Sequence, residues 1–97
     1  MQDLSGFQRD LLYTIAGYDR PNGLTIKAEL ESYYDAEVNH GRLYPNLDDL
    51  VEKGLIEKGS KDRRTNYYVL TARGRREIEA RREWENERMA DAELVSA

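Results

Sequence analysis

The sequence predicts a mainly α-helical fold with one small β-hairpin, in the order helix, helix, helix, strand, strand, helix. Helically spaced apolar residues fill the first half of the chain, two short β-prone runs flank a basic segment, and a long charged stretch follows a threonine. Together these features are typical of a winged helix-turn-helix domain. We expect residues 1–70 to hold that domain and residues 71–97 to form a C-terminal dimerisation helix of the same compact unit.

Ser5 and Gln8 open the first predicted helix, because their spacing is that of a capping box. We expect this helix to end near Tyr18. Its buried stripe consists of Phe7, Leu11, Leu12 and Ile15. Residues 19–23, DRPNG, are typical of a turn. A second helix then runs to about Asp35, with an inward face made of Ile26, Leu30 and either Tyr33 or Tyr34.

The third predicted helix has one buried face and one free face. Its apolar positions are Leu43, Leu47, Leu50 and Val51. Gly54 after Lys53 suits the C-terminus, because a left-handed residue and a nearby cation are both favourable there. Pro45 removes one helical hydrogen bond and clashes with the carbonyl group of Gly41, so we expect an irregular or late start near Gly41.

A hairpin with a basic tip follows the third helix. Residues 55–56 and 67–70 are β-prone, and residues 59–66 separate them. The tip carries three basic residues, Lys61, Arg63 and Arg64, and one acidic residue, Asp62. Thr65 follows them and is a further candidate contact. A flexible cationic loop suits the phosphates of nucleic acid, although a merely solvated hairpin is the alternative interpretation.

Thr71 is a plausible N-cap for the last helix. The first turns of that helix carry Arg73, Arg75 and Arg76, although cations are unfavourable at the positive end of a helix dipole. A nearby phosphate would relieve this repulsion, which makes the arginines a candidate second contact zone. Alternatively, Glu77 and Glu79 simply pair with them.

The last helix is also a candidate dimer contact, because it reaches about residue 90 and its sparse apolar residues fall on two sides. One side can pack on its own domain and the other on a second copy, so we predict a homodimer. Trp84 is the expected anchor, since tryptophan is enriched at interface hot spots. A tryptophan partly buried within one chain is the alternative. The residues assigned to the interface are Phe7, Ile78, Trp84 and Met89.

The net charge of −4 hides a segregation along the chain. Residues 61–82 carry eight basic and three acidic side chains, whereas the rest carries seven basic and sixteen acidic ones. A local basic patch decides attraction to phosphate, so the acidic total does not exclude nucleic acid. Four lysines against eleven arginines, with many carboxylates, fit a halophilic archaeon, although an acidic mesophile protein would look similar.

Composition also argues against several other classes of function. The chain has no cysteine and one histidine, so we expect neither a metal site nor a cofactor. Asp48 and Asp49 are adjacent and point in different directions on a helix, and no nucleophile-base pair or phosphate loop exists, so we expect no enzyme. No apolar run approaches the roughly 20 residues of a membrane span, and no signal peptide opens the chain, so we expect a cytoplasmic protein that does not contact membranes.

The N-terminal half of the third helix carries the residues expected to read DNA bases in the major groove. Arg42 could bond a guanine and Asn46 an adenine, each pair contributing about 1–3 kcal/mol of discrimination. His40 lies on the same free face. Tyr44 either packs inward or donates its hydroxyl to a phosphate. Near the start of the second helix, Thr25 and Lys27 are placed to touch the DNA backbone or are simply solvated.

Three motifs then resemble the PadR family of transcriptional regulators: Gly-x-Leu-Tyr-Pro-x-Leu at 41–47, Gly-Leu-Ile at 54–56 and Leu-Thr-x-x-Gly at 70–74. The similarity covers roughly residues 5–85. It implies a winged helix-turn-helix whose C-terminal helix dimerises and which usually represses nearby genes. By this resemblance the recognition helix starts near His40 and the wing surrounds Arg63.

The resemblance also bears on the C-terminal helix. Many members have a longer C-terminal region, so we expect a small dimer contact here. Some relatives hold planar aromatic molecules between these helices, and Trp84 is at a position where a small aromatic effector could bind.

The sequence thus predicts a transcriptional regulator that binds double-stranded DNA specifically, as a homodimeric repressor reading an inverted repeat. The alternative is a winged-helix module for protein interaction or assembly, whose acidic surface meets a basic partner.

Overall fold

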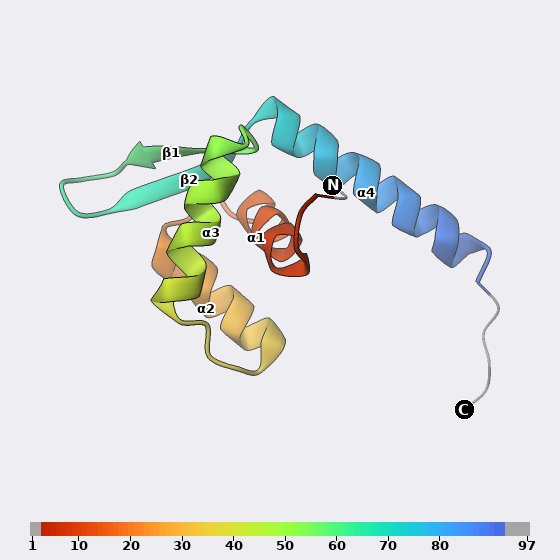
Figure 1. Ribbon diagram of the computed structural model, residues 1–97, viewed down its shortest axis with the longest axis horizontal. Helices are drawn as coiled ribbons and strands as arrows, with labels where there is room; N and C mark the ends of the chain where they lie inside the picture. The colour runs from red at the N-terminus through yellow and green to blue at the C-terminus, as the bar shows by residue number, and fades with distance from the viewer. Residues whose placement is uncertain (1–2, 93–97) are drawn as a thin grey trace.

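The computed structural model describes residues 3–92 and contains the six predicted elements in the predicted order. They are α1 (Gly6–Ala16), α2 (Gly23–Tyr34), α3 (His40–Glu52), β1 (Ile56–Ser60), β2 (Asn66–Leu70) and α4 (Ala72–Ala90). The mainly α class with one hairpin is therefore confirmed. Figure 1 shows the hairpin leaving the body on one side and α4 extending away on the other.

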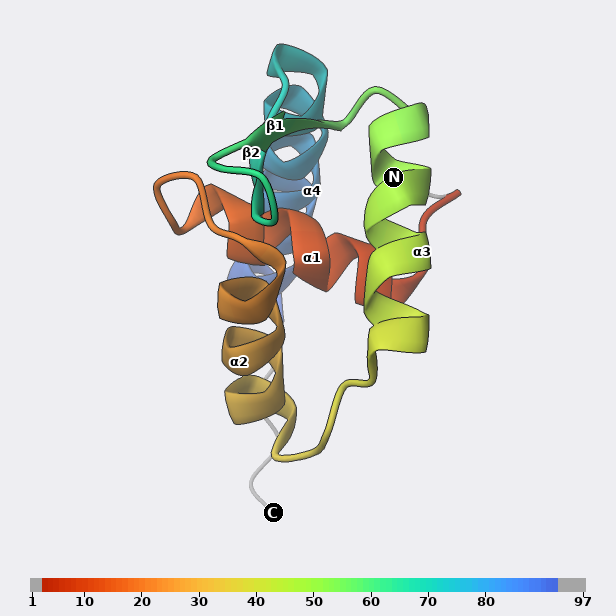
Figure 2. The same ribbon diagram turned by 90° about the vertical axis from the view of Figure 1, so that its left-hand side faces the viewer.

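Helix α1 lies at the centre of the molecule, with α2 and α3 on either side of it (Figure 2). The predicted apolar stripes meet in this core, and its most deeply buried side chains include Leu11, Leu12, Ile26, Leu30, Leu43, Leu47 and Leu50. Burial of these side chains is the main stabilising contribution to the fold. The helical periodicity of the sequence therefore identified the core correctly.

The predicted capping box opens α1. The backbone N–H of Gln8 donates to Ser5 Oγ at 3.1 Å, and the backbone N–H of Ser5 donates to Gln8 Oε1 at 3.3 Å. The helix ends at Ala16, two residues before the predicted Tyr18, and Gly17 is its C-cap.

Helix α2 begins at Gly23 because Asn22 caps it, with its side-chain oxygen accepting from the Thr25 N–H at 2.8 Å. At its other end, Asp35 is left-handed with φ 54° and terminates the helix. Of the two tyrosines considered for the inward face, Tyr34 packs against the core and Tyr33 is 78% exposed.

Helix α3 has a regular start at His40, so the expected irregular start near Gly41 was wrong. Asn39 explains the difference. Its side chain accepts from the Arg42 N–H at 2.8 Å and its carbonyl accepts from the Leu43 N–H at 3.1 Å, which satisfies two first-turn donors. At the other end, Gly54 adopts the predicted left-handed conformation with φ 75°.

The strands β1 and β2 pair antiparallel, with Ile56 opposite Leu70 and Ser60 opposite Asn66. A tight joint connects them to α4. Thr71 caps α4 by accepting from the Gly74 N–H at 3.0 Å, and its hydroxyl donates to the carbonyl of Gly54 at 2.7 Å.

Gly74 has to be a glycine at this joint, because a Cβ on it would overlap the carbonyl oxygen of Leu55. The Leu-Thr-x-x-Gly motif therefore fixes how α4 leaves the hairpin. Within residues 3–92, no helix is long and apolar enough to cross a membrane.

Candidate nucleic-acid interface

One exposed ridge of α3 carries small residues in its N-terminal half and acidic residues in its C-terminal half. Gly41, Pro45, Asp48 and Glu52 share this exposed ridge by their helical spacing. The first two present little side chain, so the N-terminal half can approach a surface closely. The carboxylates of the other two would repel phosphate, as the sequence predicted.

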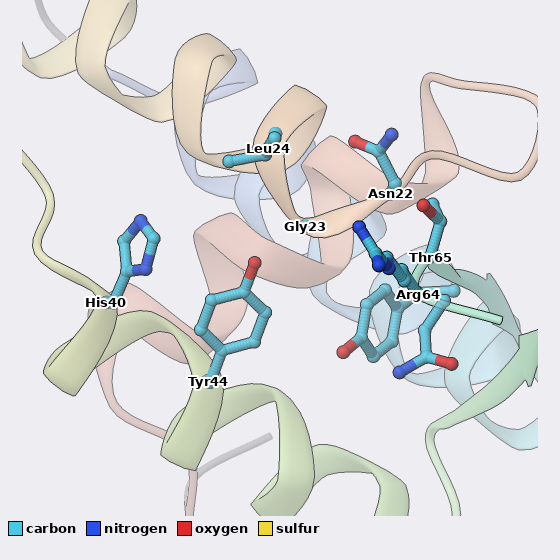
Figure 3. Close-up of a pocket in the computed structure, with 9 residues that line it drawn as sticks. Asn22, Gly23, Leu24, His40, Tyr44, Arg64 and Thr65 are labelled. Atoms are coloured by element: carbon cyan, nitrogen blue, oxygen red, sulfur yellow. The ribbon is translucent and has the colours of Figure 1, made fainter.

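A hollow of about 320 Å³ lies beside the N-terminal half of α3 (Figure 3). The start of α2 and the β1–β2 hairpin, which we call the wing, form its other walls. Its lining includes four predicted DNA contacts: His40 and Tyr44 from α3, and Arg64 and Thr65 from the wing. The other lining residues are Asn22, Gly23, Leu24, Asn66 and Tyr68. Segments far apart in the sequence thus form one concave surface, which we call the interface groove.

Tyr44 forms part of the wall of the interface groove and reaches toward the start of α2 (Figure 3). Its ring packs so closely on Gly23 that a Cβ there would lie 2.5 Å from the hydroxyl oxygen. The ring of His40 meets it edge-on, with 5.5 Å between centroids. Tyr44 therefore packs against the start of α2 and also lines the interface groove, so its contact with phosphate stays a prediction.

The wing tip presents its cations without carboxylate partners. Among residues 3–92, no ion pair engages Lys61, Arg63 or Arg64, and all three are exposed. The nearby carboxylate of Asp62 instead accepts the backbone N–H groups of Arg64 and Thr65, both at 2.9 Å. Positive charge at the tip is therefore available to a polyanion.

Arg42 and Asn46 face α1 and lie outside the interface groove. The guanidinium of Arg42 lies 4.0 Å from the centre of the Phe7 ring. Asn46 donates to the Arg42 carbonyl at 2.8 Å and accepts from the Gln8 side chain at 3.1 Å. Gln8 Nε2 also donates to Asp49 at 2.7 Å, and this bond lowers the pKa of the Asp49 carboxyl. A base contact by Arg42 would require its side chain to leave Phe7.

The two candidate backbone contacts on α2 have local partners. Lys27 pairs with Glu31 at 3.0 Å, and Glu31 also accepts the Val38 N–H at 2.9 Å. The pKa of Glu31 is lowered, first by the Val38 hydrogen bond and then by Lys27. Thr25 is half-buried in the first turn, and its N–H is engaged by Asn22.

The arginines of α4 lie apart from the interface groove. Arg73 lines a different hollow together with Glu52 and Lys53, at the C-terminal end of α3. The two interpretations of Arg73, Arg75 and Arg76, a phosphate contact and pairing with Glu77 and Glu79, both stay predictions.

Sequence reasoning missed Leu24 and Asn22 in the interface groove. Leu24 is an apolar side chain that is 63% exposed among polar neighbours. Its position, two residues after the Asn22 cap, is the signal that could have placed it at the exposed tip of α2. The wall contributed by Asn66 and Tyr68 depends on tertiary packing and has no such local signal.

The four residues assigned to a dimer contact fall into two groups. Phe7 and Ile78 are buried within the core of the single chain, so they have little surface left for a partner. Trp84 and Met89 are 49% and 68% exposed on α4. Trp84 is thus about half exposed, and its role as a dimer anchor stays a prediction.

Arginines flank the exposed Trp84 on α4. The guanidiniums of Arg81 and Arg88 lie 4.7 and 5.0 Å from its ring centre. These cation–π contacts orient the indole at the surface. Among residues 3–92, no cluster of three or more histidine, cysteine or carboxylate residues could hold a metal ion.

A winged helix with a cationic tip beside an exposed helix N-terminus is the architecture of DNA-binding regulators. The sequence matches the PadR-like family of transcriptional regulators over residues 11–80. The chain belongs to this family, as its motifs suggested. A search of curated protein sequences gave no match.

Similar solved structures agree. RosR of the halophilic archaeon Halobacterium salinarum, in a complex structure, is 48% identical with a TM-score of 0.89, over 94% of this chain and 80% of RosR. A second structure of RosR, from crystals grown from sodium bromide, is 51% identical to this chain with a TM-score of 0.86. The alignment covers 94% of this chain and 83% of RosR. RosR thus comes from the kind of organism that the lysine-poor, carboxylate-rich composition of this chain also fits.

A more distant structure shares the fold alone. PcaV of Streptomyces coelicolor, solved with its natural ligand, is 15% identical with a TM-score of 0.66. The alignment covers 94% of this chain and 65% of PcaV.

Proposed function

We propose that this PadR-like regulator is a homodimer that binds an inverted repeat in double-stranded DNA and represses the adjacent gene. One observation carries the proposal: the wing cation Arg64, which forms no ion pair among residues 3–92, and the N-terminal end of α3 border the same concave groove. A duplex that lies across this groove can contact both at once. The wing would contact phosphates, and α3 would enter the major groove.

The polarity of α3 supports this docking. Its N-terminal ridge at Gly41 and Pro45 allows close approach to base edges, and His40 lies beside it. Asp48 and Glu52 are directed to the other end, where they would not oppose phosphate. We further propose that Arg42 can swing from Phe7 to a guanine, which it could bond through two N–H groups.

Dimerisation would give the symmetry that an inverted repeat requires. In this proposal Trp84 and Met89 contact a second copy, because they are the large apolar side chains exposed on α4. Two such chains would present their α3 helices to half-sites about 34–36 Å apart, one turn of DNA. A planar aromatic effector would bind at Trp84 between the two α4 helices, where it could stack on the indole.

The competing function is a protein-interaction module with an acidic recognition surface. The overall charge of −4 favours a basic partner. Under that hypothesis, replacing Asp48 and Glu52 would weaken partner binding, and replacing wing arginines would have no effect.

The test is fluorescence anisotropy with a labelled duplex from the region upstream of the gene, titrated with salt. Arg63→Ala with Arg64→Ala should weaken binding and lower the slope of log K against log salt by about two, because each phosphate contact contributes about 0.9. The charge-matched control is Arg9→Ala with Arg82→Ala, two residues of α1 and α4 that lie outside the lining of the interface groove. Equal losses in both variants would reject the wing as the contact.

A further inference from the structure

Asp62 is the one acidic residue of the wing loop 61–65, and its carboxylate organises that loop. A single oxygen, Oδ1, accepts the backbone N–H groups of Arg64 and Thr65. The backbone closes the same turn, since the Lys61 N–H donates to the Thr65 carbonyl at 2.8 Å. Ser60 Oγ adds a bond of 2.8 Å to the Asp62 carbonyl.

This geometry directs the carboxylate of Asp62 toward the backbone of its own loop. Among residues 3–92, Asp62 forms no ion pair with Lys61, Arg63 or Arg64. The pKa of Asp62 is lowered, mainly by the hydrogen bond from the Arg64 backbone, so the carboxylate is charged near neutral pH. An anion therefore lies within a loop that is otherwise cationic.

We propose that Asp62 is a positioning residue for DNA binding, whose carboxylate holds the wing loop in the shape that places Arg64 and Thr65 at the mouth of the interface groove. The inference rests on the proposed function and extends it. Charge alone gives the opposite expectation, because an anion near phosphates should weaken binding.

The two effects can be compared in size. The repulsion is between exposed charges and is largely screened beyond about 8 Å at physiological salt. The repulsion should therefore cost little affinity. Each lost hydrogen bond is worth about a factor of two to ten, and an unheld loop must also be ordered upon binding. The hydrogen bonds of Asp62 should therefore raise DNA affinity more than its negative charge lowers it.

Two substitutions separate order from charge. In Asp62→Asn the side-chain oxygen can still accept both N–H groups, while the negative charge is absent. In Asp62→Ala both the acceptor and the charge are absent. The two variants carry the same net charge, so any difference between them reports the hydrogen bonds.

The experiment measures anisotropy for wild type, D62N, D62A and the R63A/R64A double variant, on the same upstream duplex. We expect D62N to bind at least as tightly as wild type and D62A to bind about tenfold more weakly than D62N. In the free protein, amide hydrogen exchange at Arg64 and Thr65 should accelerate in D62A and stay slow in D62N. Thermal melting of both variants checks that the fold is retained.

The outcomes distinguish the two proposals. If D62A binds as tightly as D62N while R63A/R64A is defective, the role of Asp62 is overturned and the proposed function stands. If R63A/R64A binds like wild type, the wing is not the DNA contact, and the role of Asp62 fails together with the proposed docking. If wild type does not bind the duplex, the proposed function itself fails.

Discussion

The phenol ring of Tyr44 rests directly on the backbone of Gly23, and this contact sets the spacing between α2 and α3. Gly23 is at the first position of α2, where alanine would normally be tolerated or favoured. The ring leaves no room for a methyl group there. The position is therefore governed by tertiary packing and not by helix propensity.

Gly23→Ala should lower the free energy of unfolding by about 1–3 kcal/mol, the usual cost of overpacking. Urea denaturation monitored by circular dichroism measures this change. Gly17→Ala is the matched control, since a Cβ there would make only ordinary contacts, the nearest at 3.6 Å. A Gly23→Ala variant as stable as the control would show that α2 and α3 can separate freely.

Thr71→Ala should destabilise the joint between the hairpin and α4 by about 1 kcal/mol, because the hydroxyl caps α4. It also removes the bond to the Gly54 carbonyl. Thr71→Ser keeps the hydroxyl and should retain most of the stability. Chemical denaturation of both variants tests this, and equal losses would assign the effect to the methyl group.

Stability should fall as the pH rises from about 10 to 12, and Tyr34 should contribute to that fall. Burial, followed by the hydrogen bond to Asp10, raises the pKa of Tyr34 from 10.0 to about 12. The unfolded chain then loses this proton first, so ionisation favours unfolding within that window.

The measurement is urea denaturation at several alkaline pH values. Tyr34→Phe should reduce the slope of stability against pH, because the titrating group is absent. Tyr33→Phe is the control, since Tyr33 is an exposed neighbour on the same helix. Identical slopes in wild type and Tyr34→Phe would contradict the assignment.

Trp84→Ala should weaken self-association by about 30-fold or more, the effect of losing an interface hot spot of about 2 kcal/mol. Sedimentation equilibrium measures the dissociation constant. Tyr33→Ala removes an even more exposed aromatic residue outside α4 and should leave association unchanged. A monomeric wild type would remove the basis for the predicted dimer.

Leu24 should contribute to sequence preference, because an exposed apolar side chain beside the groove can contact a thymine methyl group. Replacing thymines of the operator by uracil removes that methyl group. Wild type should lose affinity at one such position, whereas Leu24→Ala should be insensitive to the same change. If the uracil replacement weakens binding equally in wild type and in Leu24→Ala, Leu24 does not contact that methyl group.

The sequence predicted those parts of the fold that depend on local spacing. The leucines of α3 revealed its buried face, and the capping box at Ser5 and Gln8 marked the start of α1. The expected late start of α3 failed because the penalty of Pro45 was weighed without the Asn39 cap. Local rules act together, and the cap satisfied donors in the first turn.

The candidate site was only partly predictable, because periodicity assigns a residue to a face but does not give the direction of its side chain. Arg42 was placed on the free side of α3, yet its guanidinium stacks on Phe7 from α1. Leu24 became a groove residue only through the way α2 packs beside α3 and the wing.

The close contact at Gly74 couples the orientation of α4 to that of the hairpin. Glycine lets the first turn of this helix sit on the Leu55 carbonyl, so the hairpin and the helix should pivot as one piece. The helix spans about 28 Å at 1.5 Å per residue, so a small tilt at its distal end would become a displacement of several ångströms at the wing. In the proposed dimer, packing around Trp84 would thereby set the distance between the two wings, far from any contact with DNA.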